Sequence, residues 1–259
     1  MSADRAFGRR WLILASTAAL VACSTMTPPA GNSPQADTRE PVEAWLHVLR
    51  HHVNPAGQVD FAGVARAPAP LNRYVAWIAE NGPRTQPALY PDRASTLAFH
   101  LNAYNALALY HVIDAGIPMS LGGLKKIRFF WLRKIRVDGR AMSLYDYENS
   151  VIRTLGDPRI HFALNCMSVA CPVLPRVPFE AIGLDAQLEA EARKFFADPK
   201  HLKIDWANAR VQVSEILDFF PEDFLAVAPS LLEYIARYAA LPPNASLEFI
   251  PYDWTVNRQ

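Results

Sequence analysis

The chain has 259 residues, of which 51% are hydrophobic and 20% are charged, so it contains enough apolar material for a substantial core. This balance excludes an intrinsically disordered chain, and the presence of only three cysteines excludes a disulfide-rich miniprotein. The formal charge is +1, from 26 basic and 25 acidic residues without a long run of either sign, so we expect no nucleic-acid partner.

The N-terminus has the pattern of a bacterial secretion signal. Arg9 and Arg10 precede an apolar run over residues 11–22. This run is too short for a membrane-spanning helix, which needs about 20 residues. A basic segment followed by a short apolar one predicts a signal peptide over residues 1–22. The last four letters, LVAC, resemble a lipobox in which Cys23 is acylated, whereas the alternative is an ordinary signal peptide with a chance cysteine.

The segment after the lipobox predicts how the protein is attached to the membrane. Residues 23–40 are rich in proline, serine and threonine, so we expect a lipidated cysteine and a flexible tether, followed by one globular domain over residues 41–259. The expected membrane contact is the lipid anchor, on the periplasmic side of the envelope. Ser24 favours the outer membrane, because an aspartate at that position favours retention at the inner membrane.

Apolar spacing predicts a central helix surrounded by amphipathic ones. The segment from Asp92 to Ala115 is the longest, is apolar on most sides and is followed by Gly116, which predicts a buried helix with a glycine at its end. Residues 54–68 contain Asn-Pro and Gly and predict a loop. The other predicted helices cover residues 41–53, 70–81, 143–156, 185–197 and 229–240.

Short extended runs lie between these helices. Asp138-Gly139 is a typical two-residue hairpin turn and predicts paired strands over residues 133–142. Residues 202–214 predict a second hairpin, and residues 160–166 and 247–250 predict single strands. Because helices and short antiparallel strands alternate without regular βαβ units, we expect a single-domain α+β fold.

The predicted central helix contains two amide side chains among its apolar residues. Asn102 and Asn105 are three residues apart, so both project from one face of the helix, beside Tyr104. Buried amides need hydrogen-bond partners. They either hold neighbouring loops in place or, together with Tyr104, bind and orient a substrate.

The densest group of reactive side chains surrounds Cys166. Cysteine is a strong nucleophile, and a nearby histidine can lower the pKa of its thiol. An unbroken strand would separate His161 from Cys166 by about 16 Å and point them to opposite faces. His161 can therefore act on Cys166 only if the chain bends between them. Otherwise His100 or His111 on the central helix is the candidate base.

Three states of the two remaining cysteines stay open. Cys166 and Cys171 are five residues apart, and a turn between them would permit a disulfide in an oxidising compartment. The alternatives are a free reactive thiol and a pair of inert buried thiols. His47 and His51 share a helix face, but no acidic or cysteine ligand follows at a matching spacing, so we expect neither a metal nor a cofactor.

A series of motifs runs in order along the chain: residues 98–107, 143–149 and 159–166, Ser168, Cys171 and Pro172, Asp223-Phe224, and Tyr252-Asp253-Trp254 with Asn257. Together these motifs resemble the DUF547 family over residues 42–257. The sequence departs from the family pattern at His100, where tryptophan is usual, and at Met167, where glycine is common. The resemblance implies a family fold but no settled activity, and it implies a role for Cys166 that does not require Cys171.

Two functions from different classes follow. The first is a thiol hydrolase or acyl transferase, with Cys166 as nucleophile, His161 as base or orienting group, and Glu148 or Asp253 as carboxylate partner. Its substrates would be periplasmic amides or thioesters, such as peptide or cell-wall material. The second is a non-catalytic module that binds a protein or small molecule at the envelope and contains a structural disulfide between Cys166 and Cys171.

Overall fold

The computed structural model describes residues 39–259, so the predicted signal peptide, Cys23 and most of the tether lie outside the described residues. The α-helices are α1 (Arg39–His52), α2 (Phe61–Arg66), α3 (Ala69–Glu80), α4 (Arg93–Asp114), α5 (Leu124–Ile127), α6 (Leu144–Tyr147), α7 (Leu184–Ala197), α8 (Ile216–Phe219), α9 (Pro221–Leu225) and α10 (Leu231–Ile235). The 3₁₀ helices are η1 (Pro87–Leu89), η4 (Arg153–Leu155) and η5 (Pro158–Phe162), and the π-helices are η2 (Arg128–Leu132) and η3 (Glu148–Ile152). The strands are β1 (Lys134–Val137), β2 (Arg140–Ser143), β3 (Leu202–Asp205), β4 (Arg210–Ser214) and β5 (Ser246–Ile250).

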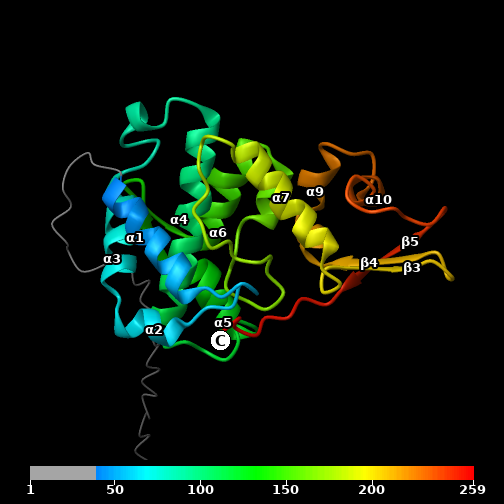
Figure 1. Cartoon of the computed structure of the whole chain (residues 1–259), viewed down its shortest axis with the longest axis horizontal. Coiled ribbons are helices and arrows are strands. Elements are labelled where there is room, and N and C mark those ends of the chain that lie inside the picture. The colour runs from blue at the N-terminus through cyan, green and yellow to red at the C-terminus, as the bar shows by residue number, and fades with distance from the viewer. Residues whose placement is uncertain (1–38) are drawn as a thin grey trace, which may run out of the picture.

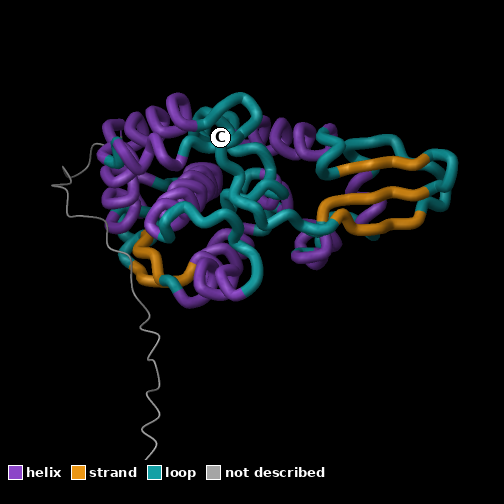
Figure 2. The backbone as a smooth tube through the Cα atoms, turned by 90° about the horizontal axis from the view of Figure 1, so that it is seen from below, coloured by secondary structure: helices purple, strands orange, loops and turns teal. Residues whose placement is uncertain are grey.

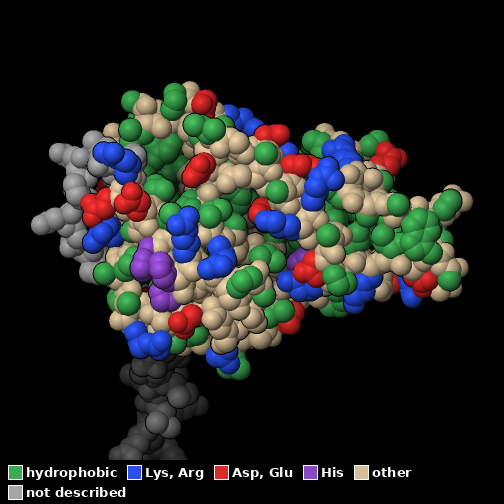
Figure 3. Space-filling model, in the orientation of Figure 1, with side chains coloured by type: hydrophobic (Ala, Val, Ile, Leu, Met, Phe, Trp, Pro, Cys, Tyr) green, Lys and Arg blue, Asp and Glu red, His purple; other side chains and the backbone are tan. Residues whose placement is uncertain are grey.

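The fold is α+β, as predicted. Figure 1 shows a helical body around α4 and a narrower extension that contains β3, β4, β5 and α10. Figure 2 shows the three strands of the extension side by side, far from the β1–β2 hairpin. On the face seen in Figure 3, basic and acidic side chains are intermixed.

Helix α4 forms the centre of the body. At its start, Asp92 and Ser95 form a capping box, in which each side chain bonds the other residue's backbone N–H. Most of the helix is buried, in agreement with its apolar sequence. At its end, Gly116 has a φ of +79° and lets the N–H of Ile117 reach the carbonyl of Val112. The predicted central helix is therefore confirmed.

The two predicted hairpins are also present. Asp138 and Gly139 have φ values of +49° and +70°, which suits the tight turn between β1 and β2. Strands β3 and β4 pair antiparallel, whereas β5 pairs parallel with β4. The parallel pairing was not predicted, because β5 reaches β4 only through the long connection that contains α8, α9 and α10.

The predicted strand over residues 160–166 is wrong. Asp157 accepts a hydrogen bond from the N–H of Arg159, and Pro158 occupies the first position of a helical turn, so the chain forms η5 instead. The separation that a strand would impose on His161 and Cys166 therefore does not apply. The predicted loop over residues 54–68 also contains a helix, α2, and the helix expected over residues 229–240 is shortened to α10.

Two hydrophobic clusters make up the core. The larger one surrounds α4, and the smaller one lies between α7, the three-stranded sheet and α9, around Phe162, Phe224 and Tyr234. The segment from η5 to Cys171 passes from one cluster to the other. Within residues 39–259, no helix combines the length and the apolar character that a membrane span requires.

Candidate functional site

The cysteine loop, residues 163–172, is held by two asparagine side chains. Asn105 donates to the carbonyl of Ala163 (3.0 Å) and accepts from the N–H of Asn165 (2.7 Å). Asn165 in turn donates to the carbonyl of Pro172 (2.6 Å) and accepts from the N–H of Met167 (2.7 Å). These four bonds satisfy both buried amides and fix the two ends of the loop relative to α4.

A tight turn follows Cys166, and the C-terminal segment (residues 252–257) covers it. Met167 has a φ of +72°, in the left-handed region that usually favours glycine. Its carbonyl accepts from the N–H of Asn257 (2.9 Å), and the N–H of Val169 donates to the carbonyl of Thr255 (2.8 Å). This pairing brings Tyr252 over the two cysteines although it lies more than 80 residues away in the chain.

The two cysteine sulfurs lie next to each other. The Sγ atoms of Cys166 and Cys171 are 2.7 Å apart and both thiols are free, whereas a disulfide bond measures about 2.05 Å. The sulfur of Cys171 also contacts the backbone N–H of Cys166 (3.0 Å), the hydroxyl of Tyr252 (3.1 Å) and the hydroxyl of Ser168 (3.4 Å). Cys171 is therefore surrounded by hydrogen-bond donors.

These contacts give the two thiols different pKa values. Burial raises the pKa of the Cys166 thiol well above its usual value, and the neighbouring Cys171 raises it further. Burial also acts on Cys171, but hydrogen bonds from Cys166, Ser168 and Tyr252 outweigh it and lower the pKa of that thiol to about 6. When the pair loses one proton, the charge therefore resides on Cys171 and the remaining proton on Cys166.

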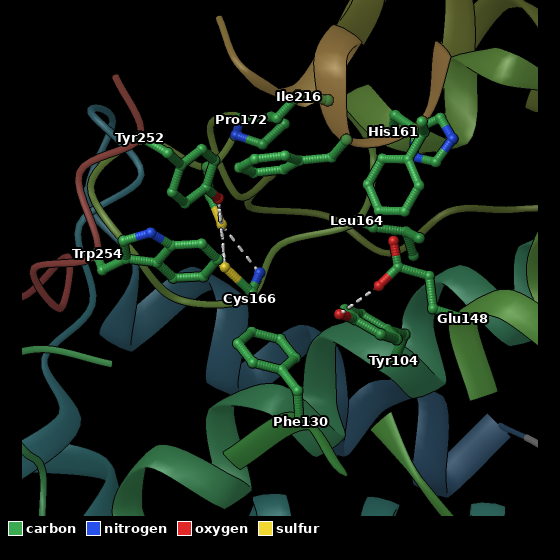
Figure 4. Close-up of a pocket in the computed structure, with 13 residues that line it drawn as sticks. Tyr104, Phe130, Glu148, His161, Leu164, Cys166, Pro172, Ile216, Tyr252 and Trp254 are labelled. Carbon is green, nitrogen blue, oxygen red and sulfur yellow. Dashed lines mark hydrogen bonds between the residues drawn. The ribbon is translucent and has the colours of Figure 1, made fainter. Parts of the chain in front are cut away.

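Both cysteines line a small cavity of about 90 Å³, here named the thiol cavity. It lies between the helical body and α8, and Figure 4 shows Cys166 with Tyr252 on one side and Glu148 with Tyr104 on the other. Aromatic side chains form much of its remaining wall, namely Phe130, Phe219, Phe220 and Trp254.

The carboxyl of Glu148 lines the thiol cavity and has an unusual pKa. Its Oε2 accepts a hydrogen bond from the hydroxyl of Tyr104 (2.9 Å). Burial raises the pKa of Glu148 to about 7, although the bond from Tyr104 and the charge of Arg153 act in the opposite direction. Near neutral pH this carboxyl is therefore present in both protonation states, which suits a group that donates and accepts protons.

His161 lines the thiol cavity but is held by other residues. Its Nε2 lies 2.7 Å from Oδ2 of Asp223, which also pairs with Arg153, and its ring stacks on Phe220 with centroids 4.2 Å apart. Burial lowers the pKa of His161 despite the favourable charge of Asp223. Within the described chain, no hydrogen bond joins His161 to the sulfur of Cys166 or Cys171. These contacts fix the ring in place.

The structure brings only some of the predicted site residues together. Cys166, Cys171, His161, Glu148 and Tyr104 all line the thiol cavity.

The others lie outside the cavity lining. Asp253 is exposed and accepts from the N–H of Thr255, and it does not line the thiol cavity. Asn102 bonds the backbone of Phe179 in both directions and Asn105 holds the cysteine loop, so both amides have the loop-anchoring role.

Sequence reasoning assigned no role to Ser168, Tyr252 or Asp223. All three occur in the motifs that carry the family resemblance, and this was the only signal in the sequence that could have identified them. Their roles depend on contacts between distant segments, which residue spacing does not predict.

The exposed rings of His47 and His51 stack 4.1 Å apart, and residues 39–259 contain no cluster of three or more potential metal ligands.

Comparison with known proteins identifies a family. Residues 90–196 match DUF547, a family described as a protein of unknown function. No curated protein and no solved structure matches the chain. The matched region contains α4 and the cysteine loop, whereas Asp223 and Tyr252 lie beyond its C-terminal end.

Proposed function

We propose that this chain, which belongs to the DUF547 family through residues 90–196, is a cysteine-dependent hydrolase or acyl transferase. The observation that carries the proposal is the sulfur of Cys171, which accepts hydrogen bonds inside a cavity that also contains a carboxyl with a pKa of about 7. A stabilised thiolate and a nearby acid–base group are the components of thiol-based acyl transfer. Cys171 replaces Cys166 as the proposed nucleophile because its thiol has the lower pKa.

The proposed reaction has two steps. The thiolate of Cys171 attacks the carbonyl carbon of an amide or thioester, the bond to the leaving group breaks, and protonated Glu148 supplies the proton that this group takes. Water then attacks the resulting thioester and gives its proton to Glu148, which releases the acid and restores the thiolate. Cys166 keeps its own proton throughout and donates its backbone N–H to the nucleophilic sulfur.

The walls of the thiol cavity limit the acyl group. Its volume of about 90 Å³ and its aromatic lining suit a small, largely apolar acyl group. The pair of His161 and Asp223 keeps one wall rigid through the stack on Phe220. We therefore assign His161 a positioning role and not that of the base.

The proposal is tested with reduced protein and p-nitrophenyl acetate. The expected result is a burst of nitrophenolate and one acetyl group per chain, located on Cys171 by fragment-ion mass spectrometry. The Cys166→Ser variant should still be acetylated, and the Cys171→Ser variant should not. Absence of acetylation in the unmodified protein, or equal acetylation of Cys171→Ser, would contradict the proposal.

A specific observation favours a second candidate, the non-catalytic binding module. The two sulfurs are 2.7 Å apart, close enough for a disulfide after a small movement. Intact mass after thiol blocking, with and without reductant, distinguishes the two. A quantitative disulfide in freshly isolated protein favours the binding module, whereas two blocked thiols favour the hydrolase.

We also propose that the protein is an outer-membrane lipoprotein facing the periplasm. The support is the short apolar run bounded by Arg10 and Cys23, followed by a segment suited to a tether. Replacement of Cys23 by serine should release the domain from the membrane fraction. Retention of the Cys23→Ser protein in the membrane pellet after a high-salt wash would contradict the lipid anchor.

A further inference from the structure

A second cavity lies at the C-terminal end of α4. It has a volume of about 390 Å³ and is bounded by the end of α4, by α5 and by η2. It shares no lining residue with the thiol cavity. We name it the basic cavity.

Positive side chains dominate its lining. Lys125, Arg128 and Arg133 contribute three positive charges, whereas Asp114 contributes one negative charge and pairs with Arg133. Lys125 and Arg128 are exposed and form no ion pair with any residue in the described part of the chain. The end of α4 adds a partial negative charge, which is smaller than the excess of positive side chains. The lining thus has an excess of nearly two positive charges, which a dianion would balance.

The same lining contains buried polar groups without a hydrogen-bond partner in the described part of the chain. His111 is completely buried, its ring stacks on Phe129, and among the described residues neither of its ring nitrogens has a hydrogen-bond partner. The Nε of Arg133 is likewise buried and has no hydrogen-bond partner within residues 39–259. Most buried donors in folded proteins are satisfied, so this combination indicates a position that a ligand completes.

We propose that the basic cavity binds a phosphate group. A dianionic phosphate matches the excess of two positive charges, whereas a single carboxylate would leave one cation unpaired. The guanidinium groups of Arg128 and Arg133 offer planar pairs of donors that fit phosphate oxygens. The imidazole of His111 supplies one further donor at the inner wall. A dianion requires a phosphate monoester, which occurs both in soluble esters and in the headgroup of phosphatidic acid, so these two sources present the same chemistry.

Phosphate binding to the purified domain tests the inference, and it does not depend on the proposed acyl-transfer activity. Inorganic phosphate is titrated by calorimetry at constant ionic strength, with chloride as the reference salt. We expect one saturable site, and about tenfold weaker binding in Arg128→Gln, which removes one charge-assisted contact. The matched control is Lys203→Gln, an exposed lysine on β3 far from the cavity, which should bind phosphate as the unmodified protein does.

The variant His111→Phe provides a second measurement. It keeps a ring against Phe129 and removes two unpaired nitrogens, so the ligand-free protein should melt at the same or a higher temperature. Phosphate should raise that melting temperature less than it does in the unmodified protein. Binding that is absent from the unmodified protein, or unchanged in Arg128→Gln, would overturn the inference.

Vesicles distinguish the two sources of phosphate. If the ligand is a lipid headgroup, the unmodified domain without its anchor should sediment with vesicles that contain phosphatidic acid, a phosphate monoester, and not with pure phosphatidylcholine. Arg128→Gln should then sediment clearly less than the unmodified domain. If free phosphate binds and neither vesicle does, the ligand is a soluble phosphate ester.

Discussion

The hydroxyl of Tyr252 lies 3.1 Å from the sulfur of Cys171, although 81 residues separate them in the chain. Burial keeps the pKa of Tyr252 well above its usual value, so the phenol remains protonated and donates to the sulfur. The C-terminal segment is thereby part of the thiol cavity. Its position depends on the backbone pairing of residues 255–257 with the cysteine loop.

The first prediction concerns the relative reactivity of the two thiols. Because the pKa of Cys171 is about 6 and that of Cys166 is raised, iodoacetamide should modify Cys171 first at pH 7. The rate should rise with pH through about 6 and level off above pH 7, since the thiolate is then fully formed. Time-resolved mass spectrometry of the reduced protein measures both sites.

Single cysteine variants provide the control for this prediction. Cys171→Ser should leave a slow reaction that continues to rise above pH 8, because the remaining thiol is buried and has a raised pKa. Cys166→Ser should keep a fast reaction. Faster modification of Cys166 than of Cys171 in the unmodified protein would reverse the assignment of the thiolate.

The second prediction concerns Tyr252. Replacement by phenylalanine keeps the ring and removes one donor to the sulfur of Cys171, a loss of about 1.5 to 3 kcal/mol for a bond to a charged group. The pKa of Cys171 should therefore rise by about 1 to 2 units. The midpoint of the alkylation profile measures this rise. The matched control is Phe219→Leu at the same cavity, which removes no donor, and an equal shift in both variants would contradict the role of the hydroxyl.

The third prediction concerns the stability cost of Glu148. Because burial raises the pKa of this carboxyl to about 7 in the folded state, its ionisation destabilises the fold progressively from about pH 4.5 to 7. Glu148→Gln cannot ionise and can still accept a bond from Tyr104. It should be more stable than the unmodified protein by about 2 to 3 kcal/mol at pH 8, and about equally stable at pH 4.5.

Urea unfolding of both proteins at the two pH values measures this difference. The comparison between proteins at the same pH cancels the contribution of the other titrating groups. A constant difference for Glu148→Gln across the pH range would show that its carboxyl has an ordinary pKa.

Local signals in the sequence predicted the elements that depend on local interactions. The capping residue Asp92, the apolar run of α4 and the turn at Asp138-Gly139 act over a few residues, and all three elements are present. The segment around Ile160 was misread because its apolar residues also suit a strand, whereas Pro158 and the capping side chain of Asp157 favour a helical turn.

The chemistry of the site depends on contacts that residue spacing does not reveal. The sequence identified Cys166 and His161, but their roles follow from partners far along the chain. Tyr252 lowers the pKa of Cys171, and Asp223 holds His161 away from hydrogen bonding with the sulfurs. Tertiary packing therefore decided which thiol is charged, although the residue types and the loop that contains them were predictable.

The last prediction concerns Lys126, whose ammonium lies over two rings that line the thiol cavity. Its Nζ lies 4.0 Å from the ring centroid of Trp254 and 5.5 Å from that of Phe219, and both rings line the cavity. The ammonium interacts electrostatically with Cys166 and should attract anionic reagents toward the sulfurs. The ratio of the alkylation rates with iodoacetate and with iodoacetamide measures this attraction, because the first reagent is anionic and the second is neutral. Lys126→Gln should lower the ratio about threefold to tenfold, as expected for one nearby charge in a partly hydrated site. Lys125→Gln on the same short helix removes an equal charge from the wall of the basic cavity and should change the ratio less. Equal effects of the two variants would mean that only the overall charge of the surface attracts the reagent.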